Sequence, residues 1–312
     1  MQTPQDKGIF WLRRTLLLLL LILVGTAFWV QGCKGCHCHD TEKCTLGVSQ
    51  PVVDGHEPPA NPFLADSPWP MMHRNPYCQA SSPFPGPTDP IPGEAPDFID
   101  GWPVPLAVAF SGPYPDGSRV IWASTGIDVF KANPCPGGCY YDKLPKEGVD
   151  FTDSAGSGLS GAYTLLDHEG TFFIPCIKRI NAYGDTTPGD PLSLIQVKGF
   201  YEIPEDRLHG GDDYIVGLNL TYDGLLAFAT RRGTVGLVSR TFDEAHFLYL
   251  GEDDEITNGI ACDEAGGIYV VTSARMLRVQ WTGSALTTEE AGGWSAEYEV
   301  GEGPVGLRIG AG

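Results

Sequence analysis

The sequence predicts an all-β fold, and three observations carry that prediction. Of the 312 residues, 42% are apolar and 19% are charged, which suits a chain with a packed core. Glycine (40) and proline (26) are frequent, and both favour turns over long helices. After Pro105 the chain consists of short apolar runs separated by Gly/Asp turns, which is typical of antiparallel strands. These features argue against helical bundles and multi-pass membrane proteins.

The charge balance excludes one class of partner. The formal net charge is −19, with 39 acidic and 20 basic side chains. A surface this acidic is repelled by phosphate backbones, so we expect no nucleic-acid partner.

One predicted structural unit recurs along the second half of the chain. It consists of a strand, an Asp/Gly hairpin turn, a second strand, a short turn and a third strand. The turn glycines are spaced by 53, 54 and 43 residues, at Gly117, Gly170, Gly224 and Gly267. Glycine supplies the positive φ that a tight turn needs, and the neighbouring Asp accepts backbone hydrogen bonds. This spacing matches one four-stranded blade, so the repeats predict a β-propeller over residues 106–312.

The number of repeats raises the question of how the ring closes. About four blade units are visible, whereas propellers have about four to eight blades and must pair their ends to avoid bare strand edges. Residues 303–312 resemble the approach to another inner strand. We therefore expect an incomplete reading frame that lacks two to four blades; the alternative is a genuine four-bladed ring.

The first 33 residues form a signal or anchor segment. Lys7, Arg13 and Arg14 precede a charge-free apolar run over residues 15–30, which is typical of a signal sequence or a short membrane anchor. This places the body on the outer face of the membrane, periplasmic or extracellular. The motif Val30-Gln31-Gly32-Cys33 resembles a lipobox and predicts lipidation of Cys33. The alternative is an uncleaved transmembrane helix with Trp29 at the interface.

Residues 34–105 form a neck rich in cysteine and proline. Its Pro-rich part predicts extended segments that lift the body off the membrane, with interspersed aromatic residues packing partly along the body's surface. The nine cysteines of an exported chain predict disulfides, and if Cys33 is lipidated the remaining eight can form four bridges. Cys135-Pro-Gly-Gly-Cys139 is the easiest local pair, because the turn brings the two sulfurs together.

Cys33-Lys-Gly-Cys36-His37 also matches the attachment signature of c-type haem, with His37 as axial ligand. The many prolines that follow disfavour the helices that wrap such a haem. A further alternative is a metal site built from Cys33, Cys36, Cys38, Cys44, His37 and His39, but exported thiolates usually oxidise. We therefore favour a disulfide-stapled neck.

The repeats resemble a group of exported bacterial propellers related to quinoprotein dehydrogenases and to gluconolactonase-type hydrolases. The segment Thr257-Asn258-Gly259 looks like the Asn-Gly segment of the gluconolactonase-type enzymes. This resemblance implies that Asn258 is a ligand of a divalent metal, with Asp213 and Asp254 as nearby acids.

The sequence motifs favour a binding role over a catalytic one. The chain contains no nucleophile elbow, zinc-binding helix, P-loop or dinucleotide fingerprint. We expect a membrane-tethered binding or scaffold module for a protein or small-molecule ligand, without a cofactor. The alternatives are a metal-dependent lactonase-type hydrolase and a haem- or quinone-linked oxidoreductase.

Overall fold

The computed structural model describes residues 57–81, 105–132, 140–148, 161–298, 301–302 and 308–309. The predicted anchor segment, residues 1–33, lies outside these ranges together with its candidate lipidation site Cys33. The candidate haem ligands Cys36 and His37 and the candidate disulfide pair Cys135 and Cys139 also lie outside them. Among the described residues the fold is all-β, apart from one short 3-10 turn at Glu205–Arg207. None of the helical structure in these ranges has the length and apolar character needed to cross a membrane.

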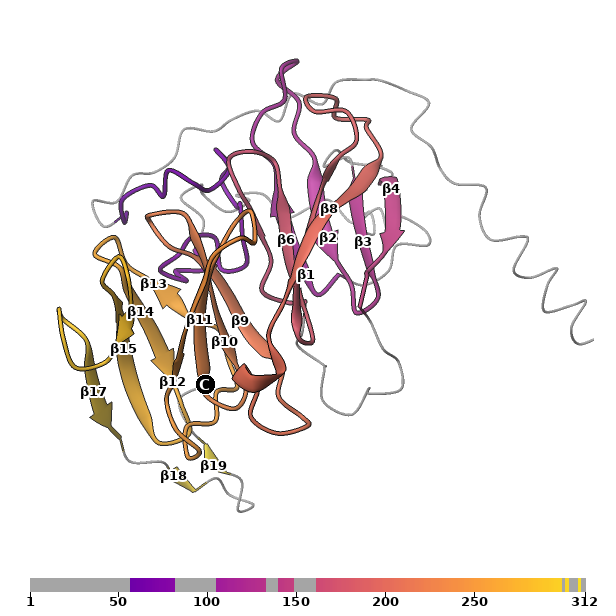
Figure 1. Ribbon diagram of the computed structural model, residues 1–312. Coiled ribbons are helices and arrows are strands. Elements are labelled where there is room, and N and C mark those ends of the chain that lie inside the picture. Colours follow the sequence, from indigo (N-terminus) through magenta and orange to yellow (C-terminus); the bar gives the residue numbers. More distant parts are fainter. Residues whose placement is uncertain are drawn as a thin grey trace, which may run out of the picture. The chain divides into compact units, whose positions relative to one another are not determined.

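Four antiparallel sheets follow one another along the chain (Figure 1). The first contains β1 (Ala107–Phe110), β2 (Ile121–Ser124), β3 (Asp128–Ala132) and β4 (Tyr140–Pro145). The second contains β5 (Leu165–Leu166), β6 (Phe172–Cys176), β7 (Arg179–Asp185) and β8 (Ile195–Glu202). The third contains β9 (Ile215–Leu220), β10 (Leu225–Thr230), β11 (Thr234–Ser239) and β12 (Ala245–Tyr249). The fourth contains β13 (Ala261–Cys262), β14 (Gly267–Val271), β15 (Arg275–Trp281), β16 (Leu286–Thr287) and β17 (Trp294–Glu297).

Every sheet pairs its strands in sequence order, which is the topology of a propeller blade. In the fourth sheet β16 and β17 both pair with β15, at different points along it. A separate hairpin joins β18 (Gly301–Glu302) to β19 (Arg308–Ile309). The predicted unit of three strands is thus confirmed, and the structure places an outer strand after it in each sheet, as the length of a four-stranded blade predicts.

The predicted turn glycines are correct in three of the four sheets. Gly117, Gly170 and Gly224 have φ values of 83°, 73° and 90°. In the fourth sheet the glycine with positive φ is Gly266 (80°), and Gly267, which we had expected there, is the first residue of β14. The double glycine made the two positions indistinguishable by sequence.

A side-chain oxygen closes the turn between the first and second strands. Asp167 accepts a hydrogen bond from the N–H of Thr171 at 2.8 Å, and Asp263 accepts one from the N–H of Gly267 at 2.7 Å. In the third sheet a threonine takes this role, since Thr221 Oγ1 accepts from the N–H of Leu225 at 2.9 Å. These bonds satisfy backbone donors that the tight turn would otherwise leave unpaired.

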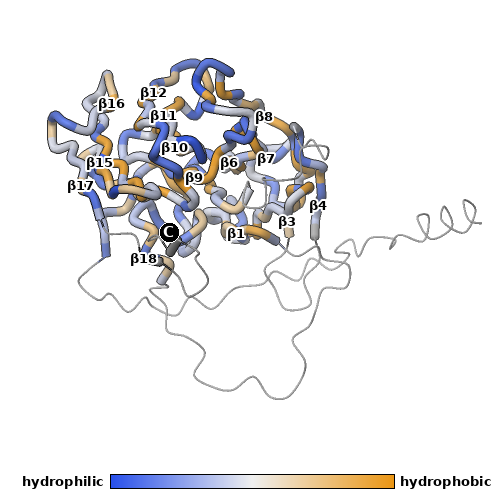
Figure 2. Tube along the Cα trace, turned by 90° about the horizontal axis from the view of Figure 1, so that it is seen from below, coloured by the Kyte–Doolittle hydropathy of each residue, from blue (hydrophilic) through white to orange (hydrophobic). Residues whose placement is uncertain are grey.

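Separate apolar cores lie between successive sheets. All residues of the first strand β9 are buried, whereas those of the fourth strand β12 are partly exposed, so each sheet runs from an inner to an outer strand. Figure 2 shows apolar stretches along several strands and hydrophilic residues at many of the turns. Fully buried Phe173, Ile180 and Phe228 contribute to the core between the second and third sheets.

A Pro-rich segment over residues 57–81, which we call the strap, lies along the first strands (Figure 1, indigo). Its backbone forms several hydrogen bonds with the second sheet. The N–H of Ala65 donates to the carbonyl of Leu166 at 3.0 Å, and the N–H of Leu166 donates to the carbonyl of Pro70 at 2.8 Å. The N–H of Met72 then donates to the carbonyl of Thr164 at 2.9 Å.

The strap also bonds to the other three sheets. The N–H of Phe110 in β1 donates to the carbonyl of Trp69 at 2.8 Å, and that of Cys262 in β13 donates to the carbonyl of Pro76 at 2.7 Å. The Asn61 side chain donates to the carbonyl of Leu220 in β9 at 3.1 Å. All four first strands therefore have polar contacts with one continuous segment.

This arrangement goes further than the spacer predicted for the neck. Leu64 and Met71 are 8% and 1% exposed and belong to the core between the second and third sheets. A first strand has a free edge, and the carbonyls of Pro70 and Pro76 can accept hydrogen bonds there even though proline cannot donate one. A Pro-rich sequence can thus satisfy strand edges while lacking the pattern of a strand.

Candidate functional site

A groove is formed by the strap and the loops of the first two sheets. It has a volume of about 1160 Å³ and lies between the strap, the β1–β2 loop, the β5–β6 turn and the β7–β8 loop. Its walls include Pro62, Pro68, Pro113 and Tyr114, which give it a rigid, partly apolar surface. A cavity of this size accommodates a drug-sized or short extended ligand.

Two cationic side chains in this groove are bonded only to neutral oxygen atoms. Arg119 Nη1 donates to the carbonyls of Asp66 at 2.6 Å and Ser111 at 2.7 Å. Lys198 Nζ donates to the hydroxyl of Thr171 at 2.6 Å. Among the described residues neither cation has a carboxylate partner, so both can still form charge-assisted hydrogen bonds with an acidic ligand.

Two carboxylates of the groove are neutralised by cations of their own. Asp167 accepts from Arg240 Nη1 at 2.6 Å, which ties the second sheet to the turn after β11. Asp185 accepts from Lys131 Nζ at 2.5 Å and from the Tyr114 hydroxyl at 2.7 Å. Burial lowers the pKa of Lys131 although Asp185 opposes that effect, and burial together with Asp185 raises the pKa of Tyr114. These pairs fix the groove walls.

The residues predicted to hold a metal lie near the opposite ends of the strands. Asp213 precedes β9 and is 1% exposed. Its carboxylate accepts from the N–H of His209 and of Arg232, both at 2.9 Å, and from the Thr230 hydroxyl at 3.1 Å. Asp213 therefore closes the turn between β10 and β11.

Asp254 occupies the matching position before β13. It accepts from Arg275 Nη2 at 2.5 Å and from the Thr272 hydroxyl at 2.7 Å, so it closes the turn between β14 and β15. Asn258 Oδ1 accepts from the Tyr163 hydroxyl and from the N–H of Gly259. Over the described ranges, no three His, Cys, Asp or Glu side chains are placed to share a metal ion.

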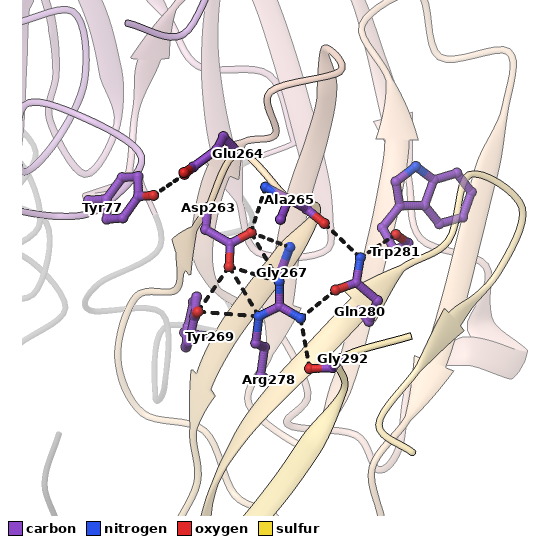
Figure 3. A network of polar contacts seen from close by, with 10 residues as sticks. All are labelled: Tyr77, Asp263, Glu264, Ala265, Gly267, Tyr269, Arg278, Gln280, Trp281 and Gly292. Atoms are coloured by element: carbon purple, nitrogen blue, oxygen red, sulfur yellow. Dashed lines mark hydrogen bonds and ion pairs between the residues drawn. The ribbon is translucent and has the colours of Figure 1, made fainter. Parts of the chain in front are cut away.

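A buried ion pair organises the fourth sheet (Figure 3). Arg278 Nη2 donates to Asp263 Oδ2 at 2.9 Å, and the Tyr269 hydroxyl donates to the same oxygen at 2.9 Å. Arg278 also contacts the Gln280 amide oxygen. Burial alone would raise the pKa of Asp263, but the Gly267 N–H and the Arg278 guanidinium outweigh burial and hold that pKa below its usual value.

Three cysteines lie in the described ranges, and all three are free thiols in this structure. Cys78 belongs to the strap, Cys176 ends β6 and Cys262 ends β13. None of these three cysteines therefore forms one of the predicted disulfides in this structure.

Sequence reasoning did not identify Arg119, Lys198 or the strap as parts of one site. Aromatic residues such as Phe63 and Trp69 alternate with prolines in this segment, and this pattern predicted that the segment packs against the body. The pattern did not predict which strap residues pair with which strands. Residues 119 and 198 line one groove because the first two sheets pack together, and no local sequence pattern predicts that packing.

The chain is similar in sequence to a curated protein. A protein of Archaeoglobus fulgidus, described as "Uncharacterized protein", is 42% identical over 268 residues, which cover 82% of this chain and 48% of the relative. The chain thus spans about half the length of the curated relative that it matches. No family model matches the sequence.

Solved structures similar to this chain include several propeller-like proteins. A streptogramin B lyase aligns with a TM-score of 0.38 and 18% identity, covering 58% of this chain and 51% of the lyase. A 6-phosphogluconolactonase-like protein from Bacteroides uniformis aligns with a TM-score of 0.43 and 11% identity, covering 58% and 55%. The β-propeller domain of Swd1 from Myceliophteria thermophila aligns with a TM-score of 0.37 and 13% identity, covering 58% and 53%. These values carry no inference about activity.

The Asp263–Arg278 pair predicts a pH-dependent stability. A carboxyl group whose pKa is lower in the folded state stabilises the fold above about pH 4, its unfolded pKa, and loses that effect as pH falls through the folded pKa. Asp263→Asn should reduce the free energy of unfolding at pH 7 by about 3 kcal/mol, because it leaves Arg278 buried without its partner.

Urea denaturation at pH 7 and pH 3 measures this effect. The stability difference between the two proteins should be smaller at pH 3 than at pH 7, because protonation of Asp263 begins to remove the ion pair. The exposed Asp206→Asn variant should change stability by less than about 0.5 kcal/mol at either pH. An equal loss at both pH values for Asp263→Asn would contradict the account.

Proposed function

We propose that this chain is an exported, membrane-tethered binding module that captures a ligand in the groove beneath the strap. Two features support the proposal: the basic segment and apolar run of residues 1–30, and the groove of about 1160 Å³. The observation that carries it is the pair of groove cations, Arg119 and Lys198, which have neutral partners while the neighbouring carboxylates Asp167 and Asp185 are already paired.

The chemistry of the groove favours a ligand that bears an acidic group on an extended, partly apolar body. Arg119 can offer further guanidinium N–H groups, and Lys198 can offer further ammonium protons, to a carboxylate. The proline and tyrosine walls suit apolar contacts. Since the whole chain carries a net charge of −19, long-range repulsion disfavours a polyanion and favours one or two acidic groups.

Matched peptides test the groove. Calorimetric titration should show the acetylated, amidated hexapeptide Ala-Ala-Glu-Ala-Ala-Glu binding more tightly than its Gln counterpart, by roughly 10-fold, because charge-assisted bonds are the stronger ones. Arg119→Gln and Lys198→Gln should each reduce this preference. Arg207→Gln makes the same charge change on the exposed 3-10 turn and should leave it unaltered.

Equal affinity for the two peptides, or a preference that survives both groove substitutions, would show that these cations do not select the ligand. The absence of any binding at millimolar peptide concentration would remove the groove as a site for acidic peptides.

Membrane attachment is tested separately in cells that produce the full chain. The protein should remain in the membrane fraction after alkaline carbonate extraction, and external protease should digest its body in intact cells, because the basic flank retains the N-terminus inside. Cys33→Ser should abolish incorporation of labelled fatty acid if Cys33 is lipidated, and should change nothing if the apolar run spans the membrane uncleaved. Recovery of the full-length chain in a soluble, protease-protected fraction would overturn the proposed tether.

A further inference from the structure

Two cysteines that are far apart in the sequence lie at one junction between the strap and the fourth sheet. The N–H of Cys262, the last residue of β13, donates to the carbonyl of Pro76 at 2.7 Å. This bond places the strap directly beside β13. Cys78 follows two residues after Pro76, and so lies at the same junction.

The strap turns back toward β13 at Cys78. The residue has a left-handed φ of 57°, and its N–H donates to the carbonyl of Asn75 at 2.8 Å. Its Sγ lies 3.3 Å from the carbonyl oxygen of Ile260, two residues before Cys262. Asn219 fixes this geometry from β9, since its Nδ2 lies 2.7 Å from the same carbonyl and 3.8 Å from Cys78 Sγ.

We propose that Cys78 and Cys262 are a disulfide-forming pair that locks the strap onto the fourth sheet. Both are free thiols here, and Cys262 is 1% exposed. Burial raises the pKa of Cys262, and a charge on the Cys78 thiolate raises it further, as expected for neighbouring sulfurs. Formation of this disulfide does not depend on which ligand the groove binds.

Bond formation requires a disulfide oxidant, of the kind present where exported proteins fold. The Cys78 thiolate attacks one sulfur of the oxidant, forms a mixed disulfide and releases one thiolate. The Cys262 thiolate then attacks the Cys78 sulfur and releases the second. The pair loses two protons and two electrons, and the oxidant is reduced to two thiols.

Cys176 provides an internal comparison. It is also buried, with 4% exposure at the end of β6. The charged groups that affect its pKa are Lys146 and Arg179, not another cysteine. Cys176 should therefore stay reduced under conditions that oxidise the proposed pair.

Peptide mapping of the oxidised full chain tests the proposal. The purified protein is incubated with oxidised glutathione at about pH 9, because burial raises the pKa of Cys78 to about 11 and slows its reaction at neutral pH. Tryptic digestion without reductant should yield peptide 75–119 joined to peptide 241–275, each of which contains one cysteine. Peptide 147–178, which contains Cys176, should remain unlinked.

The same oxidation should raise the melting temperature by about 5–15 °C, because the bridge closes a loop of roughly 180 residues. Reductant should reverse the increase, and Cys262→Ala, which keeps a small apolar side chain, should abolish both the increase and the linked peptides. Cys176→Ala should retain both. If residues 78 and 262 remain thiols, or if Cys78 is recovered only as a glutathione adduct or linked elsewhere, the proposal is wrong.

Discussion

The structure depends on hydrogen bonds between the strap and the first strands of the four sheets. A blade of four strands in sequence order leaves the inner edge of its first strand without a strand partner. The strap accepts hydrogen bonds from Phe110, Leu166 and Cys262, one in each of three sheets, and Asn61 donates to the remaining first strand. One segment thus satisfies edges that would otherwise expose or bury unpaired backbone groups.

The strap also forms part of the candidate binding groove. Because the strap crosses the turns of the first two sheets, it forms one wall of the groove, and its Asp66 carbonyl anchors the Arg119 guanidinium. The opposite ends of the strands have a different character. Asp213 and Asp254 are there bonded to the turns of their own sheets and so contribute to local structure. These contacts are the reason why we propose the groove at the strap end, and not the opposite end, as the ligand site.

Much of the fold was predictable because its signals are local. A hairpin turn needs a glycine with positive φ and a side chain that accepts backbone hydrogen bonds, and both follow directly from the residues present, as at Asp167 and Gly170. The repeat length predicted a four-stranded blade, but the positions of the outer strands were not predicted, since β12 and β8 are partly exposed and lack a strong apolar pattern. The ambiguity between Gly266 and Gly267 arose because either glycine can adopt the required φ.

The candidate site was less predictable because contacts between distant segments create it. Asn258 was assigned as a metal ligand by resemblance to gluconolactonase-type enzymes, with Asp213 and Asp254 as nearby acids. In the structure Asp254 is paired with Arg275 and Asn258 contacts Tyr163. The role of the strap rests on proline carbonyls as acceptors. Hydrophobic periodicity does not report such acceptors.

Hydrogen exchange of individual amides tests the role of the strap most directly. The N–H groups of Phe110, Leu166 and Cys262 donate to strap carbonyls and not to a neighbouring strand. If the strap is part of the stable core, these amides should exchange about as slowly as that of Ala227 in the centre of β10. Exchange at rates typical of exposed turns, with Ala227 still protected, would show that the sheets are stable without the strap and would contradict the account.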